Sequence, residues 1–253
     1  MSMILYSACT CNTGRVRKNN EDNFCFDSRI LSENNDGLRW PLIAKNRLGG
    51  RIRFAVFDGM GGENFGECAS YAAAECMKKI QAGIDGRTVP EEKILGSMCE
   101  RFNEAVIAKQ DELRTERMGS TVVMLSFSRS DVYVCNLGDS RAYRLRDGEL
   151  IQFSVDHIEK RDGQSSRKAP LTQHLGIRPD DFILEPYIAE SPLKRGDWYL
   201  LCSDGLTDML SDDEITAIIN SSTATVECAQ KLLDAALEKG GRDNTTVIVC
   251  RVL

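Results

Sequence analysis

Residues 121–149, TVVMLSFSRSDVYVCNLGDSRAYRLRDGE, decide the fold class. The stretch contains three runs with the periodicity of β-strands, at 121–128, 131–136 and 140–146. Short polar segments separate the runs, and the Asp147-Gly148 pair after the third run tolerates the positive φ angles of a tight hairpin turn. Successive hairpins of this kind predict an antiparallel sheet.

Outward from this stretch, the same periodicities predict further strands and helices. Strands are expected at 3–8, 22–27, 53–57, 198–202 and 246–252, and helices at 66–82, 90–117, 212–220 and 225–239. Ser211 and Glu214 have the spacing of a capping box before the third helix. Strands occur in runs rather than in strict alternation with helices, so the sequence favours an α+β sandwich over a doubly wound parallel sheet. The polar segments 28–50 and 159–169 are predicted to be surface loops.

Composition and charge narrow the function classes. With 253 residues, 42% of them hydrophobic, and no linker or repeat, the chain is expected to form one domain over residues 1–253. The net charge of −6 and the lack of a basic run argue against nucleic-acid binding. Residues 1–6 do not resemble a signal peptide, and no apolar run reaches membrane-spanning length, so a cytoplasmic protein without a membrane partner is expected. Most of the ten cysteines lie within apolar patterns, where reduced thiols act as small hydrophobic groups.

The most informative side chains are aspartates that follow apolar runs or neighbour glycines. They are Asp22, Asp58, Asp139, Asp204, Asp208 and Asp243. Carboxylates in such positions need a compensating cation, and few lysines or arginines stand beside them, so a metal ion is the leading candidate. Oxygen ligands without a cysteine or histidine cluster favour Mg²⁺ or Mn²⁺ over zinc. For Asp58 taken alone, helix capping is an equally good interpretation.

The acidic motifs occur in an order that resembles a known family. Arg17 with Glu21-Asp22 is followed by Asp58-Gly59-Met60-Gly61-Gly62, Gly119-Ser120-Thr121, Gly138-Asp139-Ser140-Arg141-Ala142-Tyr143, Asp156-His157, Leu171-Thr172 with Leu175-Gly176, the segment 201–208 (LCSDGLTD), and Asp243-Asn244-Thr245-Thr246. This series resembles the metal-dependent protein phosphatases of type 2C and spans residues 21–249. The resemblance implies a central β-sandwich of two antiparallel sheets flanked by α-helices, with a dinuclear metal site in a cleft at one end. It also implies a serine/threonine protein phosphatase whose substrates are phosphorylated by a cognate kinase, and we expect a monomer.

The resemblance assigns a role to each site residue. Asp58 would bridge two metal ions, and the Gly59 carbonyl would be a further ligand. Asp204 and Asp243 would complete the ligation of one ion, and Glu21 and Asp22 would hold the other side, partly through waters. Asp139 and Asp204 would surround a weaker third ion, and Arg17 would bind phosphate. Such a pair of ions activates a water for in-line attack on phosphorus.

Several alternatives remain open at the sequence level. A pseudophosphatase that binds phosphoproteins without turnover is the alternative function. Many relatives have histidine where this chain has Met60, which leaves a water or His157 as the general acid, although a structural role for His157 is favoured. Arg141 has two possible roles, pairing with a carboxylate or contact with the substrate. Asp208 also has two, orienting waters or capping the next helix.

Two short motifs suggest other chemistry and are rejected. Cys135 and Arg141 have the Cys-x5-Arg spacing of cysteine-dependent phosphatases, but the residues that follow alternate as a strand instead of opening a helix. Ser140 lacks the other members of a serine hydrolase triad.

Two segments differ from the relatives. The stretch 158–172 is shorter than the flap of bacterial relatives and carries Arg161, Arg167 and Lys168, and we hypothesise that it sets substrate choice. Segment 28–50 is interpreted as a family-variable insertion, either a docking surface or a long loop.

Overall fold

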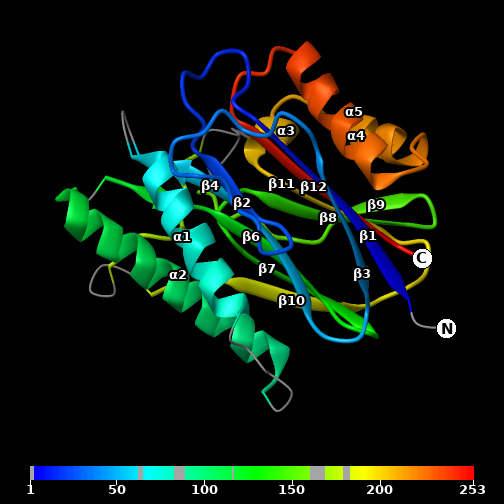
Figure 1. Ribbon diagram of the computed structural model, residues 1–253, viewed down its shortest axis with the longest axis horizontal. Coiled ribbons are helices and arrows are strands. Elements are labelled where there is room, and N and C mark those ends of the chain that lie inside the picture. The colour runs from blue at the N-terminus through cyan, green and yellow to red at the C-terminus, as the bar shows by residue number, and fades with distance from the viewer. Residues whose placement is uncertain (1–2, 62–64, 83–88, 116, 160–168, 179–182) are drawn as a thin grey trace.

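Two antiparallel β-sheets pack face to face in the computed structural model, which describes residues 3–61, 65–82, 89–115, 117–159, 169–178 and 183–253 (Figure 1). The first sheet has the strand order β3 (Leu42–Arg47), β1 (Ile4–Asn12), β12 (Thr245–Val252), β11 (Trp198–Cys202), β8 (Arg141–Arg146) and β9 (Glu149–Gln152). The second has the order β10 (Tyr187–Pro192), β7 (Asp131–Leu137), β6 (Val122–Phe127), β4 (Ile52–Met60) and β2 (Asp22–Cys25), with the short β5 (Gly119–Ser120) paired to β4.

Helices cover the outer faces of both sheets (Figure 1). On the second sheet, α1 (Gly66–Gln81) packs against β2 and β4, and α2 (Glu91–Leu113) packs against α1, β7 and β10. On the first sheet, α5 (Thr225–Glu238) packs against β1 and β12, and α4 (Asp212–Asn220) contacts α5 and β9. The single-turn α3 (Asp204–Thr207) follows β11. This layer order, helix–sheet–sheet–helix, confirms the predicted α+β sandwich.

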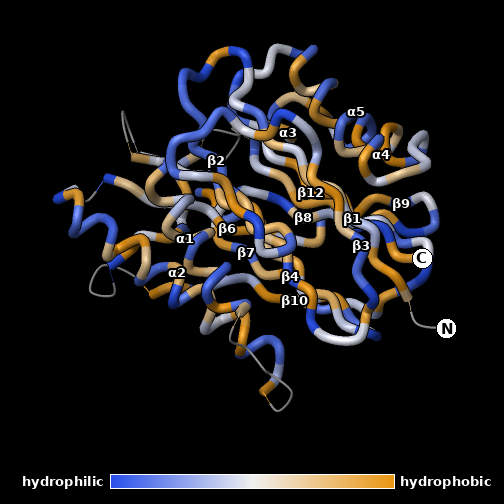
Figure 2. Tube along the Cα trace, viewed as in Figure 1, coloured by the Kyte–Doolittle hydropathy of each residue, from blue (hydrophilic) through white to orange (hydrophobic). Residues whose placement is uncertain are grey.

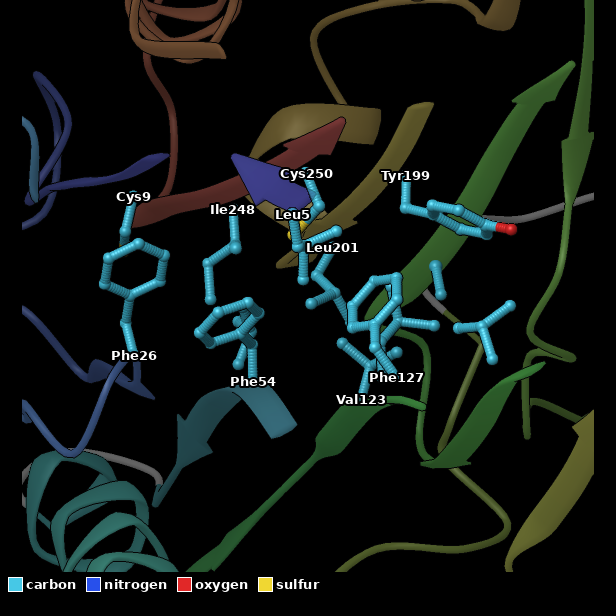
Figure 3. Close-up of a cluster of buried hydrophobic side chains, with 14 of the residues drawn as sticks. Leu5, Cys9, Phe26, Phe54, Val123, Phe127, Tyr199, Leu201, Ile248 and Cys250 are labelled. Atoms are coloured by element: carbon cyan, nitrogen blue, oxygen red, sulfur yellow. The ribbon is translucent and has the colours of Figure 1, made fainter. Parts of the chain in front are cut away.

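The main core lies between the two sheets (Figure 3). Phe54 of β4 stacks on Phe26 with 4.8 Å between ring centroids, and Phe127 of β6 meets Tyr199 of β11 edge to face at 5.3 Å. Alternate residues of β4 face the other way, so Phe57 packs beneath the helices instead. Both faces of the central strands are therefore buried, which explains why they read as continuous apolar runs.

Two local predictions, a hairpin turn and a helix capping box, are confirmed. Asp147 and Gly148 have φ angles of 52° and 86°, as the predicted hairpin turn requires. The capping box of Ser211 and Glu214 is present at the start of α4.

All ten cysteines are free thiols, and nine are buried. Figure 2 shows apolar residues concentrated on the strands and inner helix faces and polar residues on the connecting loops.

Four strands were not predicted: the two-residue β5, and β3, β9 and β10, which lie at sheet edges. β3 falls within segment 28–50, so the prediction of a loop there was wrong over Leu42–Arg47, and β9 and β10 were also missed. The residues of an edge strand face solvent in part, as Ile43 does at 57% exposure, so the apolar pattern is weak. Helix α2 ends before residue 117 because Arg114 adopts a left-handed conformation. Most of the predicted 159–169 loop lies outside the described residues.

Across the described ranges, we find no helix with both the length and the apolar character needed to cross a membrane.

Candidate metal centre

Strand pairing in the second sheet brings two of the predicted ligands together. Asp22 of β2 lies directly opposite Asp58 of β4 in the antiparallel pairing of these strands. The contact continues one residue further, where the Gly59 N–H donates to the Glu21 carbonyl at 3.1 Å. A β-carbon at residue 59 would overlap the Gly66 carbonyl oxygen, so only glycine allows α1 to start this close to the end of β4.

Helix capping does not account for Asp58. The N-cap position of α1 is Phe65, and no side-chain hydrogen bond caps that helix. The backbone N–H of Asp58 is bound by Thr121 Oγ1 at 3.1 Å, and its carbonyl accepts from Thr121 N–H at 2.8 Å. The carboxylate therefore belongs to the end of the sheet, not to the helix.

The first sheet delivers Asp204 and Asp243 to the same end. Asp204 is the first residue of α3, two residues after the end of β11, and Asp243 lies two residues before the adjacent strand β12. Asn244 fixes this end to the loop between β1 and β2, because its side chain donates to the Thr13 and Asn19 carbonyls at 2.8 and 2.9 Å. The same side chain accepts from the Glu21 N–H at 2.8 Å.

Asp22 joins the two sheets and has one oxygen without a partner. Its Oδ2 accepts from Ser203 Oγ and Thr246 Oγ1, both at 2.7 Å, while Oδ1 is buried without a hydrogen-bond partner among the described residues. Burial raises the pKa of Asp22 to about 7, although the two hydroxyl donors oppose that shift. A buried carboxylate oxygen without a donor is a position that a cation would satisfy.

Further carboxylates are close enough to perturb one another. Burial raises the pKa of Asp58 well above its ordinary value, and the negative charges of Asp22, Asp204, Asp139 and Asp243 raise it further. The pKa of Asp204 is also raised, first by burial and then by Asp139 and Asp243. A set of acids that disfavour one another's charged forms fits a divalent cation with oxygen ligands.

The gathered acids do not form a closed cage. In the described part of the chain, no three histidine, cysteine, aspartate or glutamate side chains are already arranged to hold an ion. Asp243 is turned to Arg17, whose Nη2 donates to its Oδ2 at 2.6 Å. The two features of this end that fit a cation are therefore the unpartnered Asp22 Oδ1 and the mutual repulsion of the acids.

Arg17 and Glu21 lie at the rim of this group. The Arg17 side chain is about half exposed. Burial raises the pKa of Glu21, Arg17 opposes that shift, and Glu67 and Asp243 add to it. The structure thus brings a guanidinium beside the acids, as an anion site requires.

Asp139 occupies a loop beside the other acids. Burial raises the pKa of Asp139 to about 6, and the charges of Asp156 and Asp208 add to the effect. The loop is held from two sides, since Ser140 Oγ bonds Thr121 Oγ1 at 2.7 Å and the Gly138 N–H donates to His157 Nδ1 at 3.3 Å. His157 therefore has a structural contact, and burial lowers its pKa.

The structure shows a carboxylate partner for Arg141 and a different N-cap for the helix after Asp208. Arg141 pairs with a carboxylate, with Nη2 donating to Asp156 Oδ2 at 2.6 Å. The N-cap of α4 is Ser211, so the proposal that Asp208 caps the next helix was wrong. Gly62 and the three basic residues Arg161, Arg167 and Lys168 of the 158–172 segment lie outside the described residues.

Cysteine chemistry at residue 135 finds no support in the geometry. Cys135 is fully buried in β7, with its sulfur 3.3 Å from that of Cys99. The hydrogen bond with Cys99 and burial raise the pKa of Cys135 well above its ordinary value, which disfavours the nucleophilic thiolate.

Sequence reasoning missed three positioning residues, Ser203, Thr246 and Asn244. Each lies within a recognised motif: Ser203 and Asn244 are next to an aspartate, and Thr246 is three residues after Asp243. Their roles depend on contacts across the two sheets and the β1–β2 loop, which the sequence pattern does not show.

Comparison with known proteins places this architecture in a family. Residues 34–239 match the family described as Protein phosphatase 2C. The chain belongs to the protein phosphatase 2C family. Its fold agrees with the solved structure of the catalytic domain of PstP in complex with two manganese ions, at a TM-score of 0.79 and 29% identity, with both chains covered in full. PppA of Pseudomonas aeruginosa gives a TM-score of 0.78 at 27% identity over 98% of each chain.

Two of the curated proteins that are similar to this phosphatase 2C chain come from bacteria. The serine/threonine phosphatase stp of Listeria monocytogenes is 30% identical over 93% of this chain and 91% of its own length. The serine/threonine protein phosphatase PstP of Mycobacterium tuberculosis is 29% identical over all of this chain. The chain spans about half of PstP, 46% of its length.

Proposed function

We propose that this chain is a Mn²⁺- or Mg²⁺-dependent serine/threonine protein phosphatase that hydrolyses phosphoserine and phosphothreonine in proteins. One observation carries the proposal: acids from both sheets meet at one end of the sandwich, and the buried Asp22 Oδ1 lacks a donor among the described residues. Family membership and the two manganese ions in the PstP structure support the same conclusion.

Each acid has a proposed role in holding the ions. Asp58 would be the ligand common to both ions, and Asp204 and Asp243 with the Gly59 carbonyl would complete the ligation. Glu21 and Asp22 would act from the second sheet, and Asp139 would serve a third, weaker site. When bound, such ions lower the pKa of a water and stabilise negative charge on the phosphoryl oxygens. Asp22, held at Oδ2 by two hydroxyls, keeps Oδ1 free for this purpose.

Arg17 is proposed to orient the phosphate. Its guanidinium has five N–H donors, and only Nη2 is used by Asp243. The remaining donors can bind two phosphoryl oxygens while the pair with Asp243 keeps the group beside the acids. Substrate positioning of this kind accounts for much of the rate enhancement in phosphoryl transfer.

A water is the proposed proton donor to the leaving alkoxide. The Met60 side chain has no proton to give, and its methyl group lies beside Gly119. His157 Nδ1 already accepts from the Gly138 backbone, and burial lowers its pKa, so protonated His157 is scarce near neutral pH. The substrates would be proteins phosphorylated by a cognate serine/threonine kinase, and we propose that the chain acts as a monomer.

Hydrolysis of a phosphothreonine peptide and of p-nitrophenyl phosphate tests the proposal. We expect turnover with Mn²⁺ that is lost on chelation, and a loss of at least about a hundredfold in kcat for Asp58→Asn. Asp131→Asn is the matched control, because Asp131 bonds Ser128 in the turn at the far end of β6. Folded wild-type protein that hydrolyses neither compound would contradict the proposal and favour phosphoprotein binding without turnover.

A further inference from the structure

Two loops form a rim directly beside the candidate centre. The loop 13–20 follows β1, and the loop 239–244 precedes β12; Figure 1 shows them together at the top of the view. The Arg15 N–H donates to the Gly241 carbonyl at 2.7 Å. Gly14, at φ +83°, lies so close that a β-carbon there would overlap the Asp243 carbonyl oxygen. The rim is therefore fixed in position relative to the acids.

The rim has a local charge opposite to that of the whole chain. Loop 13–20 contains three cations and no acid, whereas the chain has a net charge of −6. Arg15, Lys18 and Arg242 are exposed, and no ion pair involves them within the ranges that the structure describes. The neighbouring cations are neutralised, since Arg17 pairs with Asp243 and Lys239 with Glu214.

These three cations lie close in the sequence to the proposed phosphate-binding and metal-binding residues. Lys18 and Arg15 are one and two residues from Arg17, the proposed phosphate-binding residue, and Arg242 is adjacent to Asp243. With the phosphate at Arg17, residues on either side of the phosphorylated position come within reach of the rim. Acidic side chains there would be attracted by the rim, whereas elsewhere the net negative protein repels them.

We propose that Arg15, Lys18 and Arg242 bind acidic residues that flank the phosphoserine or phosphothreonine of the substrate. This inference rests on the proposed function, because it places the phosphate at Arg17. Three cations beside a cluster of acids are too few to hold a nucleic-acid backbone, whose further phosphates would meet those acids. Exposed ion pairs each change affinity by a few-fold, so the rim should favour acidic flanks by about tenfold.

Peptide binding tests the rim without requiring turnover. Two peptides would carry a phosphoserine mimic in which a methylene group replaces the ester oxygen, so that it resists hydrolysis. They would differ only in aspartates or asparagines on both sides of it. With wild-type protein and Mn²⁺ at low ionic strength, fluorescence anisotropy should give a Kd about tenfold lower for the acidic peptide. The ratio should approach one at high salt and in the triple variant Arg15→Gln, Lys18→Gln, Arg242→Gln.

Controls separate the rim from general charge effects. Arg129→Gln removes an exposed arginine from the turn at the opposite end of β6 and should keep the tenfold ratio. Lys18→Glu reverses one charge and should reduce the ratio even if the triple variant is poorly folded.

The outcomes are distinct for the two proposals. Equal Kd values for the two peptides with wild-type protein would contradict the proposed role of the rim. A preference for the acidic peptide that survives in both rim variants would also contradict it. Rim-dependent binding of single-stranded DNA with no peptide preference would overturn it too. A preserved peptide preference in a protein that hydrolyses neither phosphopeptide nor p-nitrophenyl phosphate would support the rim and contradict the proposed function.

Discussion

At the residue scale, the state of Asp22 depends on two hydroxyl groups. Ser203 and Thr246 both donate to Oδ2; Thr246 is in β12 of the opposite sheet, and Ser203 directly follows β11 of that sheet. Both donors favour the charged carboxylate and so oppose the rise in pKa that burial causes. They make Asp22 easier to ionise and orient its second oxygen, which is how outer hydrogen bonds support a metal ligand.

Thr246→Val should weaken Mn²⁺ binding without removing a ligand. The change keeps the side-chain shape but removes one donor, so the pKa of Asp22 rises further and protons compete better with the ion. We expect the Mn²⁺ Kd at neutral pH to rise about tenfold, and less at alkaline pH, in isothermal titration calorimetry. Thr10→Val is the control, because Thr10 contacts the Ala229 carbonyl on the helix side of the same sheet. An unchanged Kd would contradict a positioning role.

At the element scale, the sequence predicts the strands whose apolar pattern results from their own burial. The central strands β4, β6 and β7 were found because both of their faces are covered. The edge strands β3, β9 and β10 were missed because their pairing depends on a neighbour rather than on their own apolar pattern. The acids were predicted by motif, whereas the hydroxyls that bind Asp22 could not be, because the approach of the two sheets is a tertiary feature.

The junction between β8 and β11 depends on Asp197. Arg146 donates to its two carboxylate oxygens at 2.8 and 2.7 Å, and Tyr199 Oη donates at 3.0 Å. Burial alone would raise the pKa of Asp197, but donors from Arg146, the Lys194 N–H and Tyr199 outweigh it, so the pKa is lowered. A lowered folded-state pKa gives stability that is present above about pH 4 and is lost as the pH falls further.

Asp197→Asn should therefore destabilise the protein in a pH-dependent way. We expect the free energy of unfolding at neutral pH to fall by about 2–4 kcal/mol, because Arg146 loses a buried partner. The difference from wild type should shrink below about pH 4, where the wild-type carboxylate is itself protonated. Urea unfolding measures both values, with exposed Asp234→Asn as the control. A difference that stays constant with pH would rule out the charge as its origin.

At the scale of the whole molecule, the acids at one end of the sandwich reduce stability near neutral pH. Asp22 and Asp139 have raised pKa values of about 7 and about 6. The unfolded chain loses these protons near pH 4, whereas the folded chain keeps them to higher pH. Stability of the metal-free protein therefore falls as the pH rises from about 4 to about 7.

Mn²⁺ should reverse this loss. In EDTA, the unfolding temperature should be higher at about pH 5.5 than at about pH 7.5, since the acids ionise over that interval. Saturating Mn²⁺ at the higher pH should raise stability, by about 2.7 kcal/mol when the free ion is at a hundred times its Kd. Calorimetric scans measure these shifts, and Mg²⁺ provides a parallel series. An unfolding temperature that rises with pH in EDTA would contradict the account.

Electron paramagnetic resonance of the Mn²⁺-loaded protein tests the central claim, that Asp58 lies between two ions. Two ions that share a bridging ligand give a spin-coupled spectrum, whereas separate ions give the spectrum of isolated Mn²⁺. We predict a coupled spectrum for the wild-type protein and an isolated-ion spectrum for Asp58→Asn. An isolated-ion spectrum from the wild-type protein, or a coupled one that persists in Asp58→Asn, would contradict the account.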